Sequence, residues 1–497
     1  MTFDASQTTA ACQPDAGQRR FGMIGGLGPL ASVDVMFKLV QACAARGIAE
    51  PLDLVFEQHP FRSAGHTSEA TTARKLYVFD LLREFEQRGI DTVVLPCFLS
   101  HTFIDELSAN TPLQIVDMVA AQRAHLRSRY PDVRKIGVLA SDYTRQHGLF
   151  ERYFLAPEFE VLHPRLDRQL DLVTRAVYGP AGLKQGGAPA QALQLLRAAC
   201  DDLIAQGAQI ILPGLTEIAL IATDLGRFSV PLLDSNQVYA EYIAAGQYGA
   251  PHKSFKVGVV GGVGPAATVD FMRKIVLNTP ARRDQDHIKL MIEHNPQIPD
   301  RTDNLVGLGQ DPTLSLYATC KKLESGAADI IAIPCNTAHA YVERIQPYLE
   351  IPIVNMLSVT AEHLRSAFPA LRQVGVLATT GTLASGVYEQ ELIRHGLQQI
   401  APSAALQARV MHAIYGPQGV KAGFTDGVCV TDIHAALEEL AERGITVVIL
   451  GCTELPLLLP QAKLRSISGI EMTLIDPTDI LARRCVAFAT AARAESA

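Results

Sequence analysis

The stretch Gly22–Gln41, GMIGGLGPLASVDVMFKLVQ, decides the fold because the chain contains it twice. Gly258–Leu277, GVVGGVGPAATVDFMRKIVL, matches it at 11 of 20 positions, at an offset of 236 residues. In both copies a short apolar run leads into a glycine turn and then into a longer segment, an order typical of a buried strand followed by a helix. A repeat of this length indicates that the chain carries two copies of one fold.

Further paired stretches follow in the same order in both halves. They are Leu95–Cys97 with Ile333–Cys335, Tyr178–Pro180 with Tyr415–Pro417, Gly214–Glu217 with Gly451–Glu454, and Asp234 with Asp476. The offset stays between 236 and 242 residues, so we expect two homologous halves. Glycine and proline interrupt the apolar pattern between Ala244 and Lys256, where the halves join. The expected organisation is a disordered tail over 1–19, a first domain over 20–247 and a second over 255–492.

Short β-branched runs alternate with longer helical segments through both halves. Examples are Thr92–Leu95 and Ile136–Leu139 in the first half, and Ile330–Ile333 and Val447–Leu450 in the second. Continuous apolar strands followed by helices are typical of parallel sheets that are covered on both faces. The sequence therefore predicts an α/β protein, a tandem repeat in which each half has two Rossmann-like lobes with parallel sheets. We expect sites in the cleft between the lobes, outside the carboxyl ends of the strands.

Composition limits the classes of function. Of the 497 residues, 48% are hydrophobic and 19% are charged, which is typical of a globular protein. A net charge of −7 without a basic run predicts neither a nucleic acid nor a membrane as partner. The sequence has no apolar stretch of spanning length and no signal-peptide pattern at its start. We therefore expect the nine scattered cysteines to be reduced thiols in the cytoplasm.

The two glycine turns fit the dinucleotide pattern G-x-G-x-x-G/A only in part. The acidic residue expected about twenty positions on is not in place, because Glu57 and Glu293 come roughly thirty residues later. Two other interpretations stay open. The turn is purely structural, with proline at the first helical position, or its free amides hold an anion such as a substrate carboxylate.

Two cysteines of the second half occupy matching positions. Cys335 follows the strand-like run Asp329–Pro334, and Cys452 follows Thr446–Gly451. Because we expect a helix to begin at each cysteine, its free amides should lower the thiol pKa. Two such thiols across a cleft would supply one base and one acid, as inversion of a carbon next to a carboxylate requires.

The residues next to the cysteines support this interpretation. Asn336, Thr337 and Thr453 offer neutral donors for a developing enolate and a carboxylate. The alternatives are two buried structural cysteines, a redox disulfide, and a metal site that would need more ligands than Cys335 and His339 supply. His339 could tune the thiol, cap a helix or belong to the core.

Four ordered motifs of the second half resemble the cofactor-independent aspartate/glutamate racemase superfamily. The motifs are Gly261–Thr268 (GGVGPAAT), Asn295–Thr302 (NPQIPDRT), Pro334–His339 (PCNTAH) and Gly451–Glu454 (GCTE). The first two are similar to the aspartate racemase branch, and the match runs through nearly all of residues 256–490. The resemblance implies a two-lobed α/β fold with the active site between the lobes, and neither pyridoxal phosphate nor any other cofactor or metal.

The resemblance also implies roles for individual residues. Cys335 and Cys452 would be the paired acid/base thiols, and the substrate would be an acidic amino acid. The substrate-binding residues would be Arg301, Thr302, Asn336, Thr337, Lys421, Thr453 and Gly264. A guanidinium such as that of Arg301 suits bidentate capture of a carboxylate. Glu454 and Asp476 are candidates for orienting groups.

The first half keeps the frame of the second half and loses much of its site. Leu215 stands in the position of Cys452, and Phe98 and Leu99 replace Asn336 and Thr337, although Cys97 remains in the position of Cys335. We expect this degenerate copy to fold without racemising and to act as a built-in partner, because racemases of this family are commonly dimeric. This intrachain pseudo-dimer leaves open a further homo-oligomer, regulatory ligand binding and single-thiol chemistry at Cys97.

The function predicted from the sequence is a pyridoxal-phosphate-independent racemase, confined to the second half, that interconverts L- and D-aspartate, with glutamate as a second substrate. One alternative is another isomerase of the same superfamily, of the hydantoin racemase or maleate isomerase type. Another is a non-catalytic protein that binds amino acids or dicarboxylates.

Overall fold

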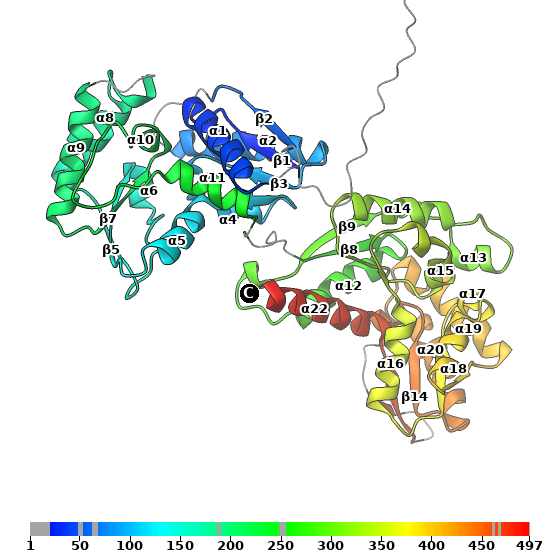
Figure 1. Cartoon of the computed structure of the whole chain (residues 1–497). Coiled ribbons are helices and arrows are strands. Elements are labelled where there is room, and N and C mark those ends of the chain that lie inside the picture. Colours follow the sequence, from blue (N-terminus) through cyan, green and yellow to red (C-terminus); the bar gives the residue numbers. More distant parts are fainter. Residues whose placement is uncertain are drawn as a thin grey trace, which may run out of the picture. The chain divides into compact units, whose positions relative to one another are not determined.

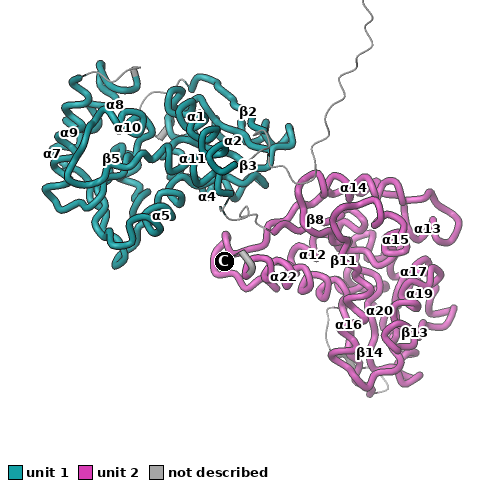
Figure 2. Tube along the Cα trace, viewed as in Figure 1, with its two compact units in different colours: residues 1–253 teal, residues 254–497 magenta. Residues whose placement is uncertain are grey.

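The computed structural model describes residues 20–47, 53–61, 68–185, 190–246, 248, 255–459, 463–465 and 469–496. The chain forms two compact units, Met1–Lys253 and Ser254–Ala497 (Figures 1 and 2). The tail expected over 1–19 lies outside the described residues, and the domain limits stay predictions. In the described ranges, no helix is long and apolar enough to cross a membrane.

The first lobe of unit 1 is a four-stranded parallel sheet in the order β2-β1-β3-β4. Its strands are β1 (Phe21–Ile24), β2 (Leu54–Glu57), β3 (Thr92–Val94) and β4 (Gln114–Val116). Its helices are α1 (Pro29–Ala45), α2 (Ser68–Gln87), α3 (Phe98–His101), α4 (Ile104–Ser108) and α5 (Met118–Arg129). Strands β1 and β3 are buried and the edge strand β2 is half-buried, as expected for a parallel sheet that helices cover.

The second lobe of unit 1 has a three-stranded parallel sheet in the order β6-β5-β7. The strands are β5 (Lys135–Ala140), β6 (Glu160–Leu162) and β7 (Ile210–Gly214). The helices are α6 (Asp142–Gln146), α7 (Leu166–Arg168), a π-helix η1 (Gln169–Thr174), α8 (Arg175–Tyr178), a 3₁₀ turn η2 (Leu183–Gln185), α9 (Ala190–Ala205), α10 (Thr216–Leu220) and α11 (Ser235–Ala245). Helix α11 returns to pack against α1 of the first lobe (Figure 1).

The first lobe of unit 2 repeats the four-stranded parallel sheet, in the order β11-β10-β8-β9. Its strands are β8 (Lys256–Gly261), β9 (Lys289–His294), β10 (Ile330–Ala332) and β11 (Ile353–Val354). Its helices are α12 (Pro265–Asn278), α13 (Arg301–Leu305), α14 (Thr313–Ser325), α15 (Val342–Ile345) and α16 (Met356–Ala367), with 3₁₀ turns η3 (Asp284–Asp286), η4 (Thr337–Tyr341) and η5 (Gln346–Tyr348).

The second lobe of unit 2 has five strands in the order β13-β12-β14-β16-β15. They are β12 (Gln373–Leu377), β13 (Gln398–Ile400), β14 (Val447–Leu450), β15 (Lys463–Arg465) and β16 (Glu471–Ile475). The helices are α17 (Thr380–Ala384), α18 (Val387–Arg394), α19 (Ala404–Tyr415), the 3₁₀ turn η6 (Val420–Ala422), α20 (Val428–Glu442), α21 (Leu455–Leu458) and α22 (Pro477–Ser496). The edge strand β15 pairs antiparallel with β16, whereas the other pairs of this sheet are parallel.

The predicted α/β tandem repeat is therefore confirmed, with two lobes in each unit. The expectation of purely parallel sheets is wrong only at β15. This strand directly precedes β16 in the chain, and neighbouring strands that follow one another without a crossover helix run antiparallel.

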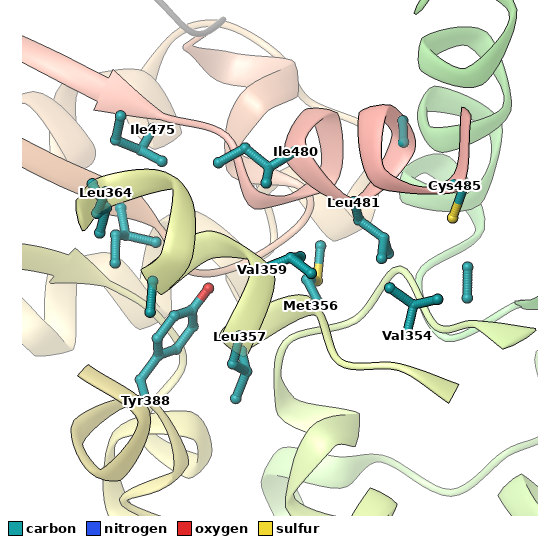
Figure 3. Close-up of a cluster of buried hydrophobic side chains, with 14 of the residues drawn as sticks. Val354, Met356, Leu357, Val359, Leu364, Tyr388, Ile475, Ile480, Leu481 and Cys485 are labelled. Carbon is teal, nitrogen blue, oxygen red and sulfur yellow. The ribbon is translucent and has the colours of Figure 1, made fainter. Parts of the chain in front are cut away.

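One hydrophobic core joins the two lobes of unit 2. Helix α22 follows the last strand of the second lobe and packs against α12 and α16 of the first (Figure 1). Figure 3 shows the centre of this core, whose labelled members are Val354, Met356, Leu357, Val359, Leu364, Tyr388, Ile475, Ile480, Leu481 and Cys485. Truncation of a fully buried leucine such as Leu481 typically costs about 2–5 kcal/mol of stability. This packing holds the lobes together, so the carboxyl ends of both sheets reach one site.

Candidate active site

Both lobes of unit 2 contribute residues to one narrow cavity. The first lobe supplies Val263, Arg301, Thr302, Cys335, Asn336 and Thr337, and the second supplies Thr379, Tyr415, Lys421, Cys452, Thr453 and Glu454. The structure thus brings together both predicted thiols and every predicted substrate-binding residue except Gly264. The cavity is about 10 Å³, enough for one water molecule. In this state the cavity has no room for a molecule larger than water.

The turn after β10 carries Cys335 and is held by a buried histidine. Cys335 is 7% exposed, and His339 contacts its carbonyl oxygen through Nδ1 at 2.9 Å. The backbone N–H of Met356, at the start of α16, donates to Nε2 of the same ring at 3.0 Å. Burial lowers the pKa of His339 to about 4, so the imidazole is neutral, with its proton on Nδ1. The Met356 contact corresponds to the helix-capping role, and together with the Cys335 contact it makes the buried His339 a clamp between the thiol turn and the start of α16.

Arg301 lies at the start of α13 and contacts the first thiol. Asp300 caps this helix by accepting hydrogen bonds from the backbone N–H groups of Thr302 and Asp303. Arg301 is 7% exposed, and its Nη1 donates to the carbonyl oxygens of Ile298 at 3.2 Å and of Pro299 at 3.1 Å. Burial would lower the pKa of the guanidinium, but Cys335 and Asp300 raise it, so Arg301 is charged.

Two buried donors of the cavity residues are unsatisfied. Within the described part of the chain, neither Nε of Arg301 nor Nδ2 of Asn336 has a hydrogen-bond partner. The other end of the Asn336 amide is fixed, because its Oδ1 accepts a hydrogen bond of 2.7 Å from Tyr388. A buried donor without a partner costs free energy, which an incoming acceptor such as a carboxylate oxygen would recover.

The second thiol lies in a hydrogen-bonded group with a lysine and a carboxylate. Cys452 Sγ is 3.1 Å from Glu454 Oε2, and Lys421 Nζ donates to Glu454 Oε1 at 2.7 Å. Burial and the Glu454 carboxylate raise the pKa of Cys452 well above its ordinary value. Burial alone would raise the pKa of Glu454, but Lys421 and Cys452 lower it. Cys452 is therefore a thiol that donates to a carboxylate.

The expectation that a helix N-terminus lowers the pKa of Cys452 is wrong. Cys452 is followed by a turn and the four-residue helix α21, which is too short to have a sizeable dipole. The helix that follows Cys335 is also short, the five-residue 3₁₀ turn η4. At Cys452, burial and the Glu454 carboxylate raise the pKa, where the sequence suggested that a helix dipole would lower it.

Hydroxyl groups connect the two lobes across the cavity. Thr302 Oγ1 donates to Thr379 Oγ1 at 2.9 Å, and Thr337 Oγ1 is 2.7 Å from that of Thr382. Tyr415 donates to Asp300 Oδ2 at 3.1 Å, and its ring lies under Lys421 Nζ at 5.3 Å from the centroid. Hydroxyl groups thus close the cavity, in pairs with one another and, at Tyr415, with a carboxylate and a lysine.

Sequence reasoning left Thr379 and Tyr415 out of the site and gave Glu454 only as an orienting candidate. The repeat carries the signal that could have found them, because Ser141, Tyr178 and Glu217 of the first half stand at their matching positions. Asp476 lies outside the cavity lining, where it caps α22 and pairs with Lys274 of α12.

Gly264 lies next to the cavity lining and not in it. Its φ of +116° is a conformation that favours glycine, and it begins α12 just before Pro265. A Cβ at this position would come within 2.6 Å of Glu454 Oε1. The glycine turn thus allows the backbone to lie close to the Glu454 carboxylate. This geometry gives the glycine a structural reason, and its contact with a substrate stays a prediction.

The fold and the site define a two-lobed α/β unit in which each lobe brings one thiol to a shared, cation-bearing cavity. Within the described ranges, no three His, Cys, Asp or Glu side chains are grouped so that they could hold a metal ion. The chain belongs to the Asp/Glu/Hydantoin racemase family, whose model matches residues 24–243 and again residues 260–485.

Three relatives illustrate the range of this similarity. The broad specificity amino-acid racemase RacX of Bacillus subtilis is 28% identical over 236 residues, which are 46% of this chain and 96% of that protein. A glutamate racemase of Corynebacterium kroppenstedtii is 31% identical over 33% of this chain and 54% of its own length. The structure of Picrophilus torridus aspartate racemase, 28% identical, covers 48% of this chain and 94% of its own, with a TM-score of 0.41.

Proposed function

We propose that unit 2 is a pyridoxal-phosphate-independent amino-acid racemase that interconverts L- and D-aspartate. The observation that carries this proposal is the placement of two thiols, Cys335 and Cys452, from different lobes at one buried cavity with an arginine. The family match supports the reaction class. Reduced thiols fit a cytoplasmic enzyme, and the cysteines that the structure describes are all free.

In the proposed reaction the thiolate of Cys335 removes the α-proton from one face of the substrate. The carbanion is an enolate of the substrate carboxylate, and the unsatisfied donors of Arg301 and Asn336 would stabilise its charge. Cys452 then delivers its proton to the opposite face and becomes the thiolate. One proton leaves the substrate and one enters it, so the two thiols exchange protonation states and the reverse reaction begins from Cys452.

The charges at the site bear on the substrate. Arg301 and Lys421 would hold the two carboxylates of aspartate, but Lys421 is paired with Glu454. If this pair stays closed, only Arg301 is left for a carboxylate, and the substrate would be an amino acid with an uncharged side chain. We keep such a racemase as the second candidate, and the name of the Bacillus subtilis relative, broad specificity, agrees with it.

Incubation with single enantiomers in deuterium oxide tests the reaction and its substrate together. A racemase must exchange the α-proton of its substrate for deuterium as the other enantiomer appears, whereas a binding protein must not. We expect exchange with aspartate and no exchange with hydantoins or maleate. Exchange confined to uncharged amino acids would select the second candidate, and an absence of exchange with any amino acid would contradict both.

We further propose that unit 1 acts as a partner of unit 2 in an intrachain pseudo-dimer. Each unit exposes apolar residues on the helix that follows its glycine turn: Leu30, Val33, Phe37 and Val40 on α1, and Val269, Val276 and Leu277 on α12. Exposed apolar faces of this extent are typical of protein interfaces. The matching position of the two faces in the repeat supports a paired arrangement.

A further inference from the structure

Tyr388 is a buried tyrosine of unit 2 whose hydroxyl contacts a residue of the site. It lies on α18 of the second lobe, it is 1% exposed, and its ring is part of the core that joins the two lobes (Figure 3). Its hydroxyl donates to Oδ1 of Asn336, in the first lobe, at 2.7 Å. Burial raises the pKa of Tyr388, so the hydroxyl keeps the proton that it donates. Asn336 lines the cavity, whereas Tyr388 lies behind the lining.

This hydrogen bond fixes the direction in which the Asn336 amide faces. A side-chain amide is planar, with an acceptor oxygen on one side and a donor NH2 group on the other. Because Oδ1 is bound to Tyr388 behind the lining, Nδ2 is left for the cavity, and it has no partner among the described residues. Without the hydroxyl of Tyr388 the amide could turn over and present its oxygen, which would repel an enolate.

The repeat in the sequence gives an independent observation on this pair. The stretch GVYE around Tyr388 matches the stretch GLFE around Phe150 of unit 1, at an offset of 238 residues. The same offset places Phe98 at the position of Asn336. Phe98 and Phe150 are buried and contact each other, with ring centroids 5.5 Å apart. The unit without the second thiol has therefore replaced both members of the hydrogen-bonded pair by a pair of apolar rings.

The fold accepts phenylalanine at the position of Tyr388, as Phe150 shows in unit 1. The hydroxyl of Tyr388 is thus tied to the amide that it contacts and not to the packing of α18. We propose that Tyr388 is a positioning residue for racemisation, which holds the Asn336 amide so that Nδ2 faces the reacting carboxylate of the substrate. This inference rests on the proposed function of unit 2. Negative charge grows on that carboxylate as the enolate forms, so a fixed donor acts mainly on kcat.

A cycle of two substitutions in the full-length chain tests this role. Asn336→Ala removes the donor, and loss of one such donor typically lowers kcat about 10²- to 10³-fold. Tyr388→Phe leaves the donor present but free to turn, so we expect kcat to fall roughly tenfold with little change in KM. In the Asn336→Ala background the same change should alter kcat less than about twofold, because Tyr388 acts only through Asn336. A tyrosine kept for packing alone would lower kcat by the same factor in both backgrounds.

Asn336→Asp tests the direction of the amide without a change at Tyr388. An aspartate has nearly the same shape and still accepts the hydrogen bond from Tyr388, but it offers the cavity an acceptor in place of a donor. We expect kcat to fall at least as far as in Asn336→Ala. Activity close to that of the native chain would mean that the oxygen of Asn336 faces the cavity, and it would overturn the proposal.

NMR of the side-chain amides detects the same contact without any substrate. In a chain labelled with nitrogen-15 at asparagine, the Nδ2 signal of Asn336 is the one that Asn336→Ala lacks. We expect Tyr388→Phe to shift this signal. The rings of tyrosine and phenylalanine have nearly the same ring current, so the shift reports the lost hydrogen bond. The signals of the other asparagines should stay in place, which also shows that the variant has folded.

Three further outcomes would overturn the proposal. They are an Asn336 signal that Tyr388→Phe leaves unmoved, a native kcat in Tyr388→Phe, and a loss of kcat in the double variant that equals the product of the two single losses. If the native chain exchanges the α-proton of no amino acid, the role in racemisation falls together with the proposed function. The NMR shift then still decides whether Tyr388 holds the amide.

Discussion

The two thiols of unit 2 have neighbours of opposite charge. Cys335 contacts the guanidinium of Arg301, and Cys452 donates to the carboxylate of Glu454 at 3.1 Å. A cation stabilises a thiolate and an anion stabilises a thiol. We therefore infer that Cys452 is protonated in the resting site and is the proton donor of the proposed reaction, before any substrate is present.

Replacement of either thiol should stop racemisation. Cys335→Ser and Cys452→Ser each remove one of the two proton carriers, and general acid–base groups typically contribute 10²- to 10⁴-fold to rate. We expect kcat, measured as the change in optical rotation, to fall at least 10²-fold in each variant. Cys43→Ser, at a half-buried thiol outside the cavity lining, is the control. Substantial activity in either single variant would rule out the two-thiol mechanism.

Glu454→Gln should change the pH dependence of the reaction. The Glu454 carboxylate raises the pKa of Cys452 together with burial, so a neutral glutamine should lower this pKa. Because the proposed reaction needs Cys452 protonated, the alkaline limb of the kcat/KM profile should move to lower pH. The pH dependence of Cys452 alkylation, read by peptide mass spectrometry, should move in the same direction.

Glu391→Gln is the matched control for this shift. Glu391 is a buried carboxylate of the same lobe, paired with Arg394 on α18 at 3.0 Å and absent from the cavity lining. Loss of the Glu391 carboxylate should lower the stability of unit 2 and leave the alkaline limb of the kcat/KM profile at the same pH. An unchanged limb in Glu454→Gln, with activity retained, would mean that Glu454 only anchors Lys421.

At the scale of elements, the histidine clamp connects the thiol turn to α16. His339 bridges the Cys335 carbonyl and the Met356 backbone N–H, both buried. Its pKa is lowered to about 4 by burial, so the folded unit binds the neutral form and the unfolded chain takes up a proton below about pH 6.5. The stability contributed by His339 is therefore complete above pH 6.5 and is lost as the pH falls toward 4.

Urea unfolding of the native chain and of His339→Gln checks this contribution. We expect the free energy of unfolding of unit 2 to fall by up to about 3 kcal/mol between pH 6.5 and 4, on the order of 1.4 kcal/mol for each unit of lowered pKa. His339→Gln should be less stable at neutral pH by about 1–3 kcal/mol, because backbone groups lose their partner. Its stability should also depend less on pH; an identical pH dependence in both chains would contradict the assignment.

The elements that the sequence predicted are those that local pattern defines. The glycine turns, the buried strands before Cys335 and Cys452, and the duplication were all legible, because apolar runs and turn residues act within a few positions. The sequence did not show that η4 and α21 are short. For that reason the raised pKa of Cys452 could not be predicted either. Burial and the position of Glu454 relative to Lys421, 33 residues earlier, are results of tertiary packing.

The same distinction, between local sequence pattern and tertiary packing, decides which residues of the site could be predicted. Cys335 and Cys452 were found because each follows a buried strand at the predicted cleft, and Arg301 was found through the motif that resembles the racemase family. Thr379 and Tyr415 enter the cavity from the second lobe through contacts with Thr302 and Asp300 across the cleft. Such contacts between lobes depend on how two sheets pack, which one sequence does not encode as a local pattern.

At the scale of the whole molecule, the proposed reaction requires unit 2 to open and close during each turnover. The cavity of about 10 Å³ excludes a substrate, and the Thr302–Thr379 hydrogen bond of 2.9 Å spans the two lobes. Neutral hydroxyl contacts of this kind are worth only about 0.5–1.5 kcal/mol each. The closed state is therefore held weakly at the cleft, and the shared core around α22 keeps the lobes in one unit while the cleft opens.

The contribution of unit 1 to the whole chain can be measured with the fragment 254–497. In the fragment, α12 would expose Val269 and Leu277, which are 66% and 68% exposed on unit 2, without the proposed partner. We expect the fragment to lose activity on dilution and to regain it when the separately expressed first half is added. A fragment that is active only as a homodimer also supports the proposal, since a second copy then takes the place of unit 1. A fragment that is monomeric and fully active at every concentration would contradict the pseudo-dimer.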